Sequence, residues 1–462
     1  MPERQNIVKQ FLKDYMVIPK MLYFVLNLCI YSTHTFEAHF FEDKLELEIY
    51  QYGFLASLKG FHFVGAIFWA GLNDRIGYTK HILSFCALGY CLSYCGLWVG
   101  NSFELGTAFK FIYLGTMVSL SNIFVSALFP LTDVTVMSML SSDPNFNKEV
   151  FGRIRLWSAF GHGFITFVNS RKLKHAAHHW IFINLCICTA LVIILVQLFL
   201  QKTAKKSDSK IPGKHAIEEK LDGVNEAEVA RNRQRPLLRL LSSPDFVFCL
   251  FVFLLAGYSR AILSNFHGYF MDVVMGKGKK IVGNATFFRT GSEVAIFFFG
   301  KHLLNYFGVY WLLLFGEMIG IIRIFAYGVL PMHGKWFYMV FPLESLKGAN
   351  TACVVMAGVR IATDSAPVGT KSTAQALFSG IYSGLGSVFG GVIAGVLIYL
   401  FADHPLRSNS GVAPMFLVAS IICYIGCILC FVKYAILDKY ICIGTSKKQD
   451  PEIPMVEKSD LK

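Results

Sequence analysis

The sequence predicts an all-α membrane protein with about twelve transmembrane helices in two six-helix bundles. Of its 462 residues, 54% are hydrophobic and 16% are charged, and the mean hydropathy is +0.50. Such a chain has too little polar surface to cover a water-soluble globule of this size. Stretches of about 20 apolar residues, the length of helix that crosses a bilayer core, recur twelve times along it.

One long polar segment divides these stretches into two sets of six. Gln201–Arg239 contains ten Lys or Arg residues and six Asp or Glu residues, a composition typical of a flexible linker. We therefore expect an N-terminal bundle at 1–200, a linker at 201–244, a C-terminal bundle at 245–440 and a polar tail at 441–462. The expected spans are 17–40, 50–72, 80–100, 105–128, 153–170, 179–200, 245–270, 281–302, 309–330, 335–358, 372–402 and 412–434.

The distribution of charge predicts the orientation and excludes some classes of function. An even number of spans places both termini on one side, and the basic linker predicts that this side is the cytoplasm. The formal charge of +13 lies mainly between apolar runs, which indicates contact with lipid headgroups and not with nucleic acid. Nine of the twelve cysteines stand in apolar runs, so we interpret them as packing residues and expect no metal site and no cofactor.

Small residues recur in the eleventh predicted span. Gly386, Gly390, Gly391 and Gly395 lie at helical spacings. Small residues at such spacings let two helices approach closely in lipid, so we expect tight helix packing here.

The loop between the second and third spans carries the most specific motif. Residues 71–80 read GLNDRIGYTK, which resembles the signature Gly-x-Leu-Ala-Asp-Arg-x-Gly-Arg-Lys of the major facilitator superfamily, with departures at Asn73, Tyr78 and Thr79. The resemblance implies the major facilitator fold, made of two pseudo-repeated six-helix bundles. It also implies a loop that gates the conformational change, formed here by Gly71, Asp74, Arg75 and Gly77; an ordinary charged turn is the alternative.

A second pair of segments narrows the resemblance. Pro130 and Asp133 in the fourth span, followed by the run FGRIRLW at residues 151–157, are similar to the lactose-permease-like branch, which includes nucleoside symporters. The resemblance implies that Asp133 and Arg155 form a charged pair at a sugar site. His162 replaces the aromatic residue that would stack on the sugar, which predicts a different solute. A position at headgroup depth, where charges are common, is the alternative for the pair.

Charged residues within apolar runs indicate a site in the second half. Glu293 and Arg323 lie midway along their spans, where an ionisable group in lipid usually faces a cavity or a partner, and both match proton-coupling positions of the branch. A structural ion pair is the alternative. Glu344 and Lys347 share one helix face. Asn350 stands where lactose permease has a proton-carrying glutamate, so we expect Glu344 or Glu293 to take that role, unless transport is not driven by protons.

Further titratable residues lie on the first and seventh spans. His34 and Glu37, three residues apart, are expected to share a helix face, and Glu37 is a further candidate for proton coupling. A solvated helix end is the alternative. Arg260 and His267 are seven residues apart and share a face of the seventh span, from which they are candidates for solute binding.

Together these features predict a multi-pass secondary transporter that moves a small polar solute by alternating access. Sugars and nucleosides are the favoured solutes, H⁺ is the candidate coupling ion, and the chain is expected to be monomeric in the lipid bilayer. No P-loop and no constellation of nucleophile and base occurs in the sequence, so neither an ATP-driven pump nor an enzyme is expected. The alternative is a receptor or scaffold that does not transport, which the changes at His162 and Asn350 favour. The sequence does not identify the membrane.

Overall fold

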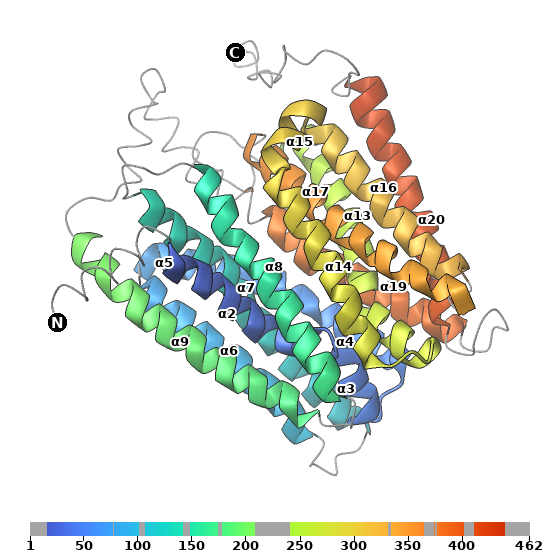
Figure 1. Cartoon of the computed structure of the whole chain (residues 1–462), viewed down its shortest axis with the longest axis horizontal. Coiled ribbons are helices and arrows are strands. Elements are labelled where there is room, and N and C mark those ends of the chain that lie inside the picture. Colours follow the sequence, from blue (N-terminus) through green and yellow to red (C-terminus); the bar gives the residue numbers. More distant parts are fainter. Residues whose placement is uncertain are drawn as a thin grey trace.

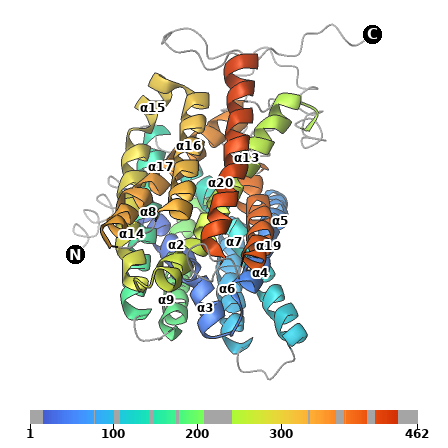
Figure 2. The ribbon, with the colours of Figure 1, turned by 90° about the vertical axis from the view of Figure 1, so that its right-hand side faces the viewer.

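The computed structural model describes residues 16–76, 78–100, 107–141, 148–173, 178–207, 241–330, 334–364, 374, 377–401 and 411–438. Within these residues every element is helical, and the helices form twelve rods that run side by side (Figure 1, Figure 2). The prediction of an all-α protein with about twelve spans is thereby confirmed.

Six of the rods form the N half, residues 16–207. Two of the rods are broken into shorter helices, and the other four are single helices. In chain order the elements are α2 (Val17–His34) with α3 (Glu37–Asp43); α4 (Ile49–Ser57), η1 (Leu58–Gly60) and α5 (Phe61–Ile76); α6 (Thr79–Val99); α7 (Thr107–Ser141); α8 (Lys148–Lys172); and α9 (His179–Ser207).

The other six rods form the C half, residues 241–438. Three of them contain a π-helical segment, namely η4, η6 and η7. In chain order the elements are α13 (Pro244–Tyr269) with η4 (Phe270–Val274); α14 (Lys279–Phe298) with α15 (Gly300–Phe307); α16 (Val309–Val329); η5 (Gly334–Met339) with α17 (Val340–Asp364); η6 (Gly380–Leu385) with α19 (Gly386–Leu400); and α20 (Val412–Phe431) with η7 (Val432–Leu437).

The ends of several rods differ from the predicted spans. The first span breaks between His34 and Glu37, so these two residues belong to different helices and the expected shared face does not exist. The fourth helix continues through Pro130 to Ser141, so Asp133 lies within a helix. The sixth helix extends to Ser207, into the predicted linker, because Gln, Ala and Lys favour helix. Most of the linker and the tail lie outside the described residues, and the domain boundaries remain predictions.

Hydropathy separates the rods into two groups. Eight of them are long and apolar enough to cross a membrane by composition alone. The remaining four are α2, α8, α14 and α17, which pack in a row: α2 lies against α8, α8 against α14, and α14 against α17. The least apolar helices therefore lie together through the middle of the molecule, where neighbouring protein replaces lipid.

The two ends of the bundle differ in how the halves meet. We call the end at which α9 finishes and α13 begins the linker end, and the opposite one the α3 end; Figure 2 shows α15 near the former and α3 near the latter. Near the α3 end, Lys59 of the N half donates a hydrogen bond of 3.0 Å to Asn265 of the C half. Arg171 and Asn284 also meet across the halves, at 3.3 Å.

The two most extensive helix contacts between the halves are α8 with α14 and α4 with α19. The predicted stripe of small residues lies in the second pair. A Cβ atom on Gly391 would lie 2.5 Å from the backbone nitrogen of Ser57, and one on Gly53 would lie 2.8 Å from the Cα atom of Gly395. On its other side the stripe meets α13, where Gly386 packs against Gly257. The expected close packing is confirmed, and it binds one half to the other.

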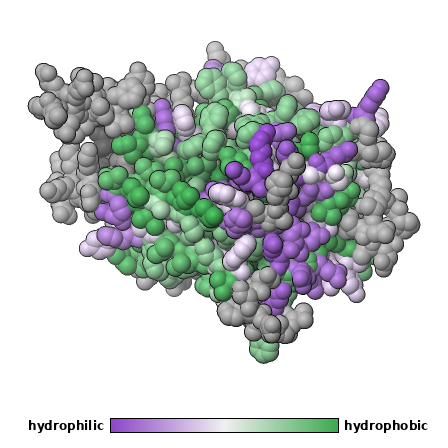
Figure 3. Space-filling view, turned by 60° about the horizontal axis from the view of Figure 1, so that its bottom comes forward, coloured by the Kyte–Doolittle hydropathy of each residue, from purple (hydrophilic) through white to green (hydrophobic). Residues whose placement is uncertain are grey.

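The outer surface has the character of a protein in lipid. Large apolar side chains are exposed along most rods, for example Phe68 and Leu92 in the N half and Tyr399 and Leu437 in the C half. Figure 3 brings the lower side of the view in Figure 1 forward and shows hydrophilic side chains gathered beside an extensive hydrophobic surface. An apolar surface of this extent requires a lipid environment, so the chain is an integral multi-pass membrane protein.

Candidate functional site

The predicted pair of Asp133 and Arg155 is formed in the N half. Asp133 of α7 lies 3.6 Å from Arg155 of α8, measured from carboxylate oxygen to guanidinium nitrogen. Tyr23 of α2 donates its hydroxyl hydrogen to the same carboxylate. The two charged side chains are 25% and 40% exposed, so solvent reaches them. Tyr23 was not identified from the sequence, where it is one aromatic residue among many in an apolar run.

His162 stacks on Tyr31 of α2. Their ring centroids are 3.8 Å apart and the rings are nearly parallel, at 14°. His34 lies on the other side of Tyr31, with centroids 5.6 Å apart. The imidazole of His162 therefore occupies the face of an aromatic ring of the protein, whereas the ring of His34 is tilted by 54° relative to that of Tyr31.

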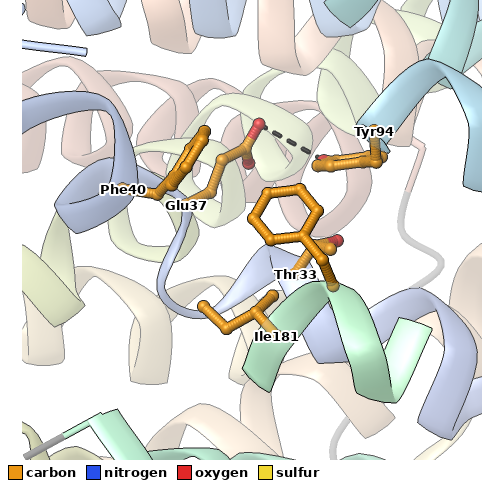
Figure 4. Close-up of a pocket in the computed structure, with 6 residues that line it drawn as sticks. Thr33, Glu37, Phe40, Tyr94 and Ile181 are labelled. Carbon is orange, nitrogen blue, oxygen red and sulfur yellow. Dashed lines mark hydrogen bonds between the residues drawn. The ribbon is translucent and has the colours of Figure 1, made fainter. Parts of the chain in front are cut away.

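Glu37 forms an ion pair that the sequence analysis missed. Its carboxylate lies 2.6 Å from Lys59, while Tyr94 donates a hydrogen bond of 3.3 Å to the other carboxylate oxygen (Figure 4). Lys59 also reaches Asn265, so the carboxylate is connected to the C half. A lysine within the apolar run of the second span was the available signal. Glu37 is buried and its partner is Lys59, not His34.

In the C half, Glu344 is the centre of a buried network. Arg323 donates to its carboxylate, His267 lies 3.2 Å from it, and Tyr327 donates a hydrogen bond of 3.1 Å. His267 and Tyr327 are themselves 3.0 Å apart. The structure thus pairs Arg323 with Glu344, whereas the sequence analysis had considered Arg323 together with Glu293.

Glu293 has a different partner on its own helix. Arg289 lies four residues earlier on α14, with its Nε atom 3.9 Å from the carboxylate. This is a loose pair, and Arg289 Nε has no hydrogen-bond acceptor among the described residues. Arg289 was also missed, although it stands in the same apolar run as Glu293. Both side chains are 15% exposed, less than the Asp133 pair and more than the Glu344 network.

The remaining predicted residues of the C half fall into two groups. Asn350 donates a hydrogen bond of 2.7 Å to the carbonyl of Gly316 and so ties α17 to α16. Arg260 donates to the carbonyl of Ser383, at 3.2 Å, and lies over the ring of Tyr382. Lys347 is 9% exposed, and within the described residues it has neither a hydrogen bond nor an ion pair.

Only part of the predicted gating loop is described. Gly71 lies on the exposed side of α5, and a Cβ atom added to it would meet no described atom within 4 Å. The side chains of Asp74 and Arg75, and Gly77 as a whole, lie outside the described residues. Thr79 donates a hydrogen bond of 2.7 Å to Asn73, which connects the start of α6 to the end of α5. The gating role of the loop remains a prediction.

A group of ion pairs joins the halves at the α3 end. Asp43 lies 3.0 Å from Lys279 and 3.4 Å from His178, and His39 lies 3.0 Å from Asp272. The close contact with His178, together with Lys279, lowers the pKa of Asp43 below its ordinary value. We call these five residues the α3-end cluster. No motif marked it in the sequence, because its members come from loops and helix ends far apart in the chain.

Two further groups were not predicted. The thiols of Cys91 and Cys95 each lie 3.8 Å from that of Cys186, so three cysteines taken as separate packing residues form one group on α6 and α9 that could hold a metal ion. Glu317 of α16 is buried, and its Oε1 atom has no hydrogen-bond partner among the described residues. An acidic residue within the ninth apolar run was a signal for Glu317 that the sequence analysis overlooked.

Comparisons with known proteins agree with this architecture. The model of the MFS_1 like family matches residues 16–408. Among solved structures, the nucleoside transporter NupG superposes with a TM-score of 0.69 at 12% identity, covering 90% of this chain and 99% of that one. A D-xylose-proton symporter superposes with a TM-score of 0.64 at 12% identity, covering 88% and 96%. A peptide transporter POT in complex with sulfate gives 0.63 at 12% identity, covering 90% and 93%.

At these identities the superpositions establish the fold, which is the one that the motif at 71–80 predicted. No curated protein matches the sequence. The family model covers most of the chain, including the N half, the C half up to residue 408, and every residue of the Asp133 pair, the Glu344 network and the α3-end cluster. The chain therefore belongs to the MFS_1 like family of major facilitator proteins.

Proposed function

We propose that this protein is a secondary active transporter that moves a small polar solute across a membrane by alternating access. The observation that carries the proposal is the row of the four least apolar helices, α2, α8, α14 and α17, in which charged and aromatic side chains of both halves face one another. Charged groups within a membrane protein are costly unless they have partners or serve a pathway.

The way in which the halves meet supports alternating access. The α3-end cluster and the contacts of Lys59 and Arg171 hold the halves together near one end. Within the bundle, Arg155 toward the linker end is 40% exposed, whereas Glu37 toward the α3 end is 2% exposed. These features fit a state that is closed at the α3 end and accessible from the linker end. Breaking the α3-end contacts while the linker ends approach would expose the site to the other side.

Three further parts of the proposal concern coupling, orientation and assembly. Glu293 is the preferred proton carrier, because its pair with Arg289 is loose and its carboxylate is partly exposed. Glu344 is held by three partners and is less free to exchange a proton. The basic composition of the linker supports a cytoplasmic position for the linker end and both termini. The protein acts as a monomer, with both halves of the pathway supplied by one chain.

Counterflow in proteoliposomes tests the proposal. Purified protein is reconstituted in vesicles loaded with unlabelled sugars, nucleosides, amino acids or organic acids, and uptake of the labelled solute is followed. We expect counterflow of at least one solute, reduced by Arg155→Ala and unchanged by Arg360→Ala, since Arg360 is an exposed residue paired with Asp364 on its own helix. Saturable binding without flux of any of these solutes would contradict transport and indicate a receptor.

A crosslink tests the alternating mechanism separately. Asp43 and Lys279 belong to different halves and their charged atoms are 3.0 Å apart. The double variant Asp43→Cys/Lys279→Cys, joined by a short bifunctional thiol reagent, should lose counterflow and recover it when a reducible crosslinker is cleaved. Each single variant, treated in the same way, controls for the native cysteines. Flux that persists in the fully crosslinked double variant would rule out opening at the α3 end.

A further inference from the structure

Among the described residues, the charged side chains that face one another between the halves do not all form ion pairs. Ten charged side chains interact with one another or with the facing half, and we call them the central charges. Six are cations and four are carboxylates: Lys59, Arg155, Arg260, Arg289, Arg323 and Lys347 against Glu37, Asp133, Glu293 and Glu344. Each carboxylate forms an ion pair with one cation, which leaves two cations over.

The cations without a carboxylate partner in the described residues are Arg260 and Lys347. Arg260 donates only to neutral groups, the carbonyl of Ser383 at 3.2 Å and the hydroxyl of Ser387 at 3.4 Å, and its Nε atom is buried without an acceptor. Lys347 is buried to more than nine-tenths and has neither hydrogen bond nor ion pair there, although Glu344 and Glu293, each paired with an arginine, lie within electrostatic range of it. Glu317, a further buried carboxylate, has no ion pair with either of them and lies within electrostatic range of the cysteines of α20.

Both cations belong to the same region between the halves. His34 of α2 interacts electrostatically with Lys59 of its own half and with three cations from different helices of the C half, Arg260, Lys347 and Arg289. His162 of α8 interacts with Lys347 and Arg289 in the same way. The positive charges of α13, α14 and α17 therefore lie near the stacked rings of Tyr31 and His162 and the tilted ring of His34 on the N half.

A buried cation without a counter-ion is unfavourable, because burial removes its hydration and nothing replaces it. A bound anion would supply that counter-charge. We infer that the solute is a small organic anion whose carboxylate or phosphate group binds between Arg260 and Lys347, while its remainder lies against the rings of Tyr31 and His162. This inference rests on the proposed transport function, and it departs from the neutral sugar or nucleoside that the sequence favoured.

A comparison of matched solutes tests the inference on the wild-type chain. Thermal unfolding of the purified protein is measured with three pairs that differ in charge: glucuronate and glucose, uridine monophosphate and uridine, succinate and succinamide. Because a ligand that binds the native state raises its apparent stability, at least one anion should raise the melting temperature by several degrees. Its neutral partner should not. The first and third pairs test a carboxylate and the second tests a phosphate, and sodium chloride and inorganic phosphate control for any small anion.

Variants of the two cations assign the effect to its site. Lys347→Gln and Arg260→Gln should each weaken binding of the active anion about tenfold or more, whereas Lys347→Arg should retain most of it. Arg360→Gln removes an exposed positive charge away from the central charges and should leave binding unchanged. Size-exclusion profiles and melting temperatures without ligand show whether each variant is folded. The comparison of matched solutes uses the wild-type chain and so does not depend on the folding of any variant.

Counterflow with the same solutes distinguishes the two proposals. Counterflow of an anion that is lost in Lys347→Gln supports both. Counterflow of glucose or uridine, with none of an anion, would overturn the inference of an anionic solute and leave the transporter intact. Equal stabilisation by both members of every pair, or binding of the anion that survives both Gln variants, would also overturn it. Tight binding of an anion without any flux would overturn transport but support the anion site.

Discussion

The Asp133 pair in the N half and the Glu344 network in the C half contain the same chemistry in opposite surroundings. Each joins a carboxylate to an arginine and a tyrosine hydroxyl. Arg155 and Asp133 are 40% and 25% exposed, whereas Arg323 and Glu344 are 2% and 4% exposed. The exposed pair can exchange its partner for water or a solute. The buried network cannot do so without leaving a charge unpaired.

This contrast indicates different roles for the two groups. Exposed ion pairs contribute little to stability, because water competes for both charges. Breaking a buried pair is costly, because the remaining charge stays in a medium of low dielectric constant. We therefore expect the Asp133 pair to act in solute binding and the Glu344 network to hold α13, α16 and α17 together. The predicted part of Arg323 and Glu344 in proton coupling remains untested.

The largest expected effect is on the stability of the buried network. Arg323→Met leaves the carboxylate of Glu344 without its main partner and should destabilise the protein by about 3–5 kcal/mol. The double variant Arg323→Met/Glu344→Leu removes both charges and should recover part of that loss. Melting temperatures of purified protein measure both. A single variant as stable as the wild type would show that the network is not structural.

Next in size is the effect of the exposed pair on transport. Arg155→Ala should change the free energy of unfolding by no more than about 1 kcal/mol, yet reduce counterflow about tenfold or more. Asp133→Asn should behave in the same way. Melting temperature and initial counterflow rate, measured on the same preparation, separate the two effects. Equal losses of stability and flux would mean that both pairs have the same role.

Loss of the stack of His162 on Tyr31 should have a smaller effect than the Arg323 and Arg155 variants. An aromatic stack of this kind is worth about 0.5–1.5 kcal/mol, so His162→Ala should lose about that much stability and His162→Phe should retain it. If the imidazole itself contacts the solute, His162→Phe will bind more weakly while remaining stable. Binding of the solute found by counterflow, compared between the two variants, distinguishes stacking from hydrogen bonding.

The smallest expected effect concerns the pH dependence of closure at the α3 end. Because the pKa of Asp43 is lowered in the closed state, its contribution is complete above its ordinary pKa and is lost only as the pH falls through the lowered value. Closure should therefore not vary with pH through Asp43 between about pH 5 and 8. Asp43→Asn should weaken closure by less than about 1 kcal/mol.

Thiol labelling measures that closure. A cysteine introduced at His39, which is 1% exposed and lies beside Asp272, should react slowly when the α3 end is closed. Its labelling rate should rise in Asp43→Asn, and the ratio of the two rates, in which the pH dependence of the reactive thiolate cancels, should be the same at pH 5.5 and 7.5. The rate is taken relative to the chain without the introduced cysteine. A strong pH dependence that disappears in Asp43→Asn would contradict the lowered pKa.

The sequence by itself determined the class of protein, the number of spans and their division into two halves. These depend on local quantities, since a bilayer requires an apolar run of fixed length wherever a helix crosses it. Charges within such runs also marked Glu293 and Arg323 as exceptional, because an ionisable residue in lipid needs a special surrounding, whereas Arg155 was marked by the resemblance to a family. Spacing along one helix even predicted which small residues on α19 permit close packing.

Only the tertiary structure decided which charge pairs with which. Arg323 binds Glu344 and not Glu293, and Glu37 binds Lys59 and not His34, because helices remote in sequence lie side by side and the first rod breaks before Glu37. The same pairing leaves Arg260 and Lys347 without carboxylates in the described structure. Charge balance is a property of three-dimensional neighbourhoods, so the solute class that it indicates could not be obtained from the residues of any one helix.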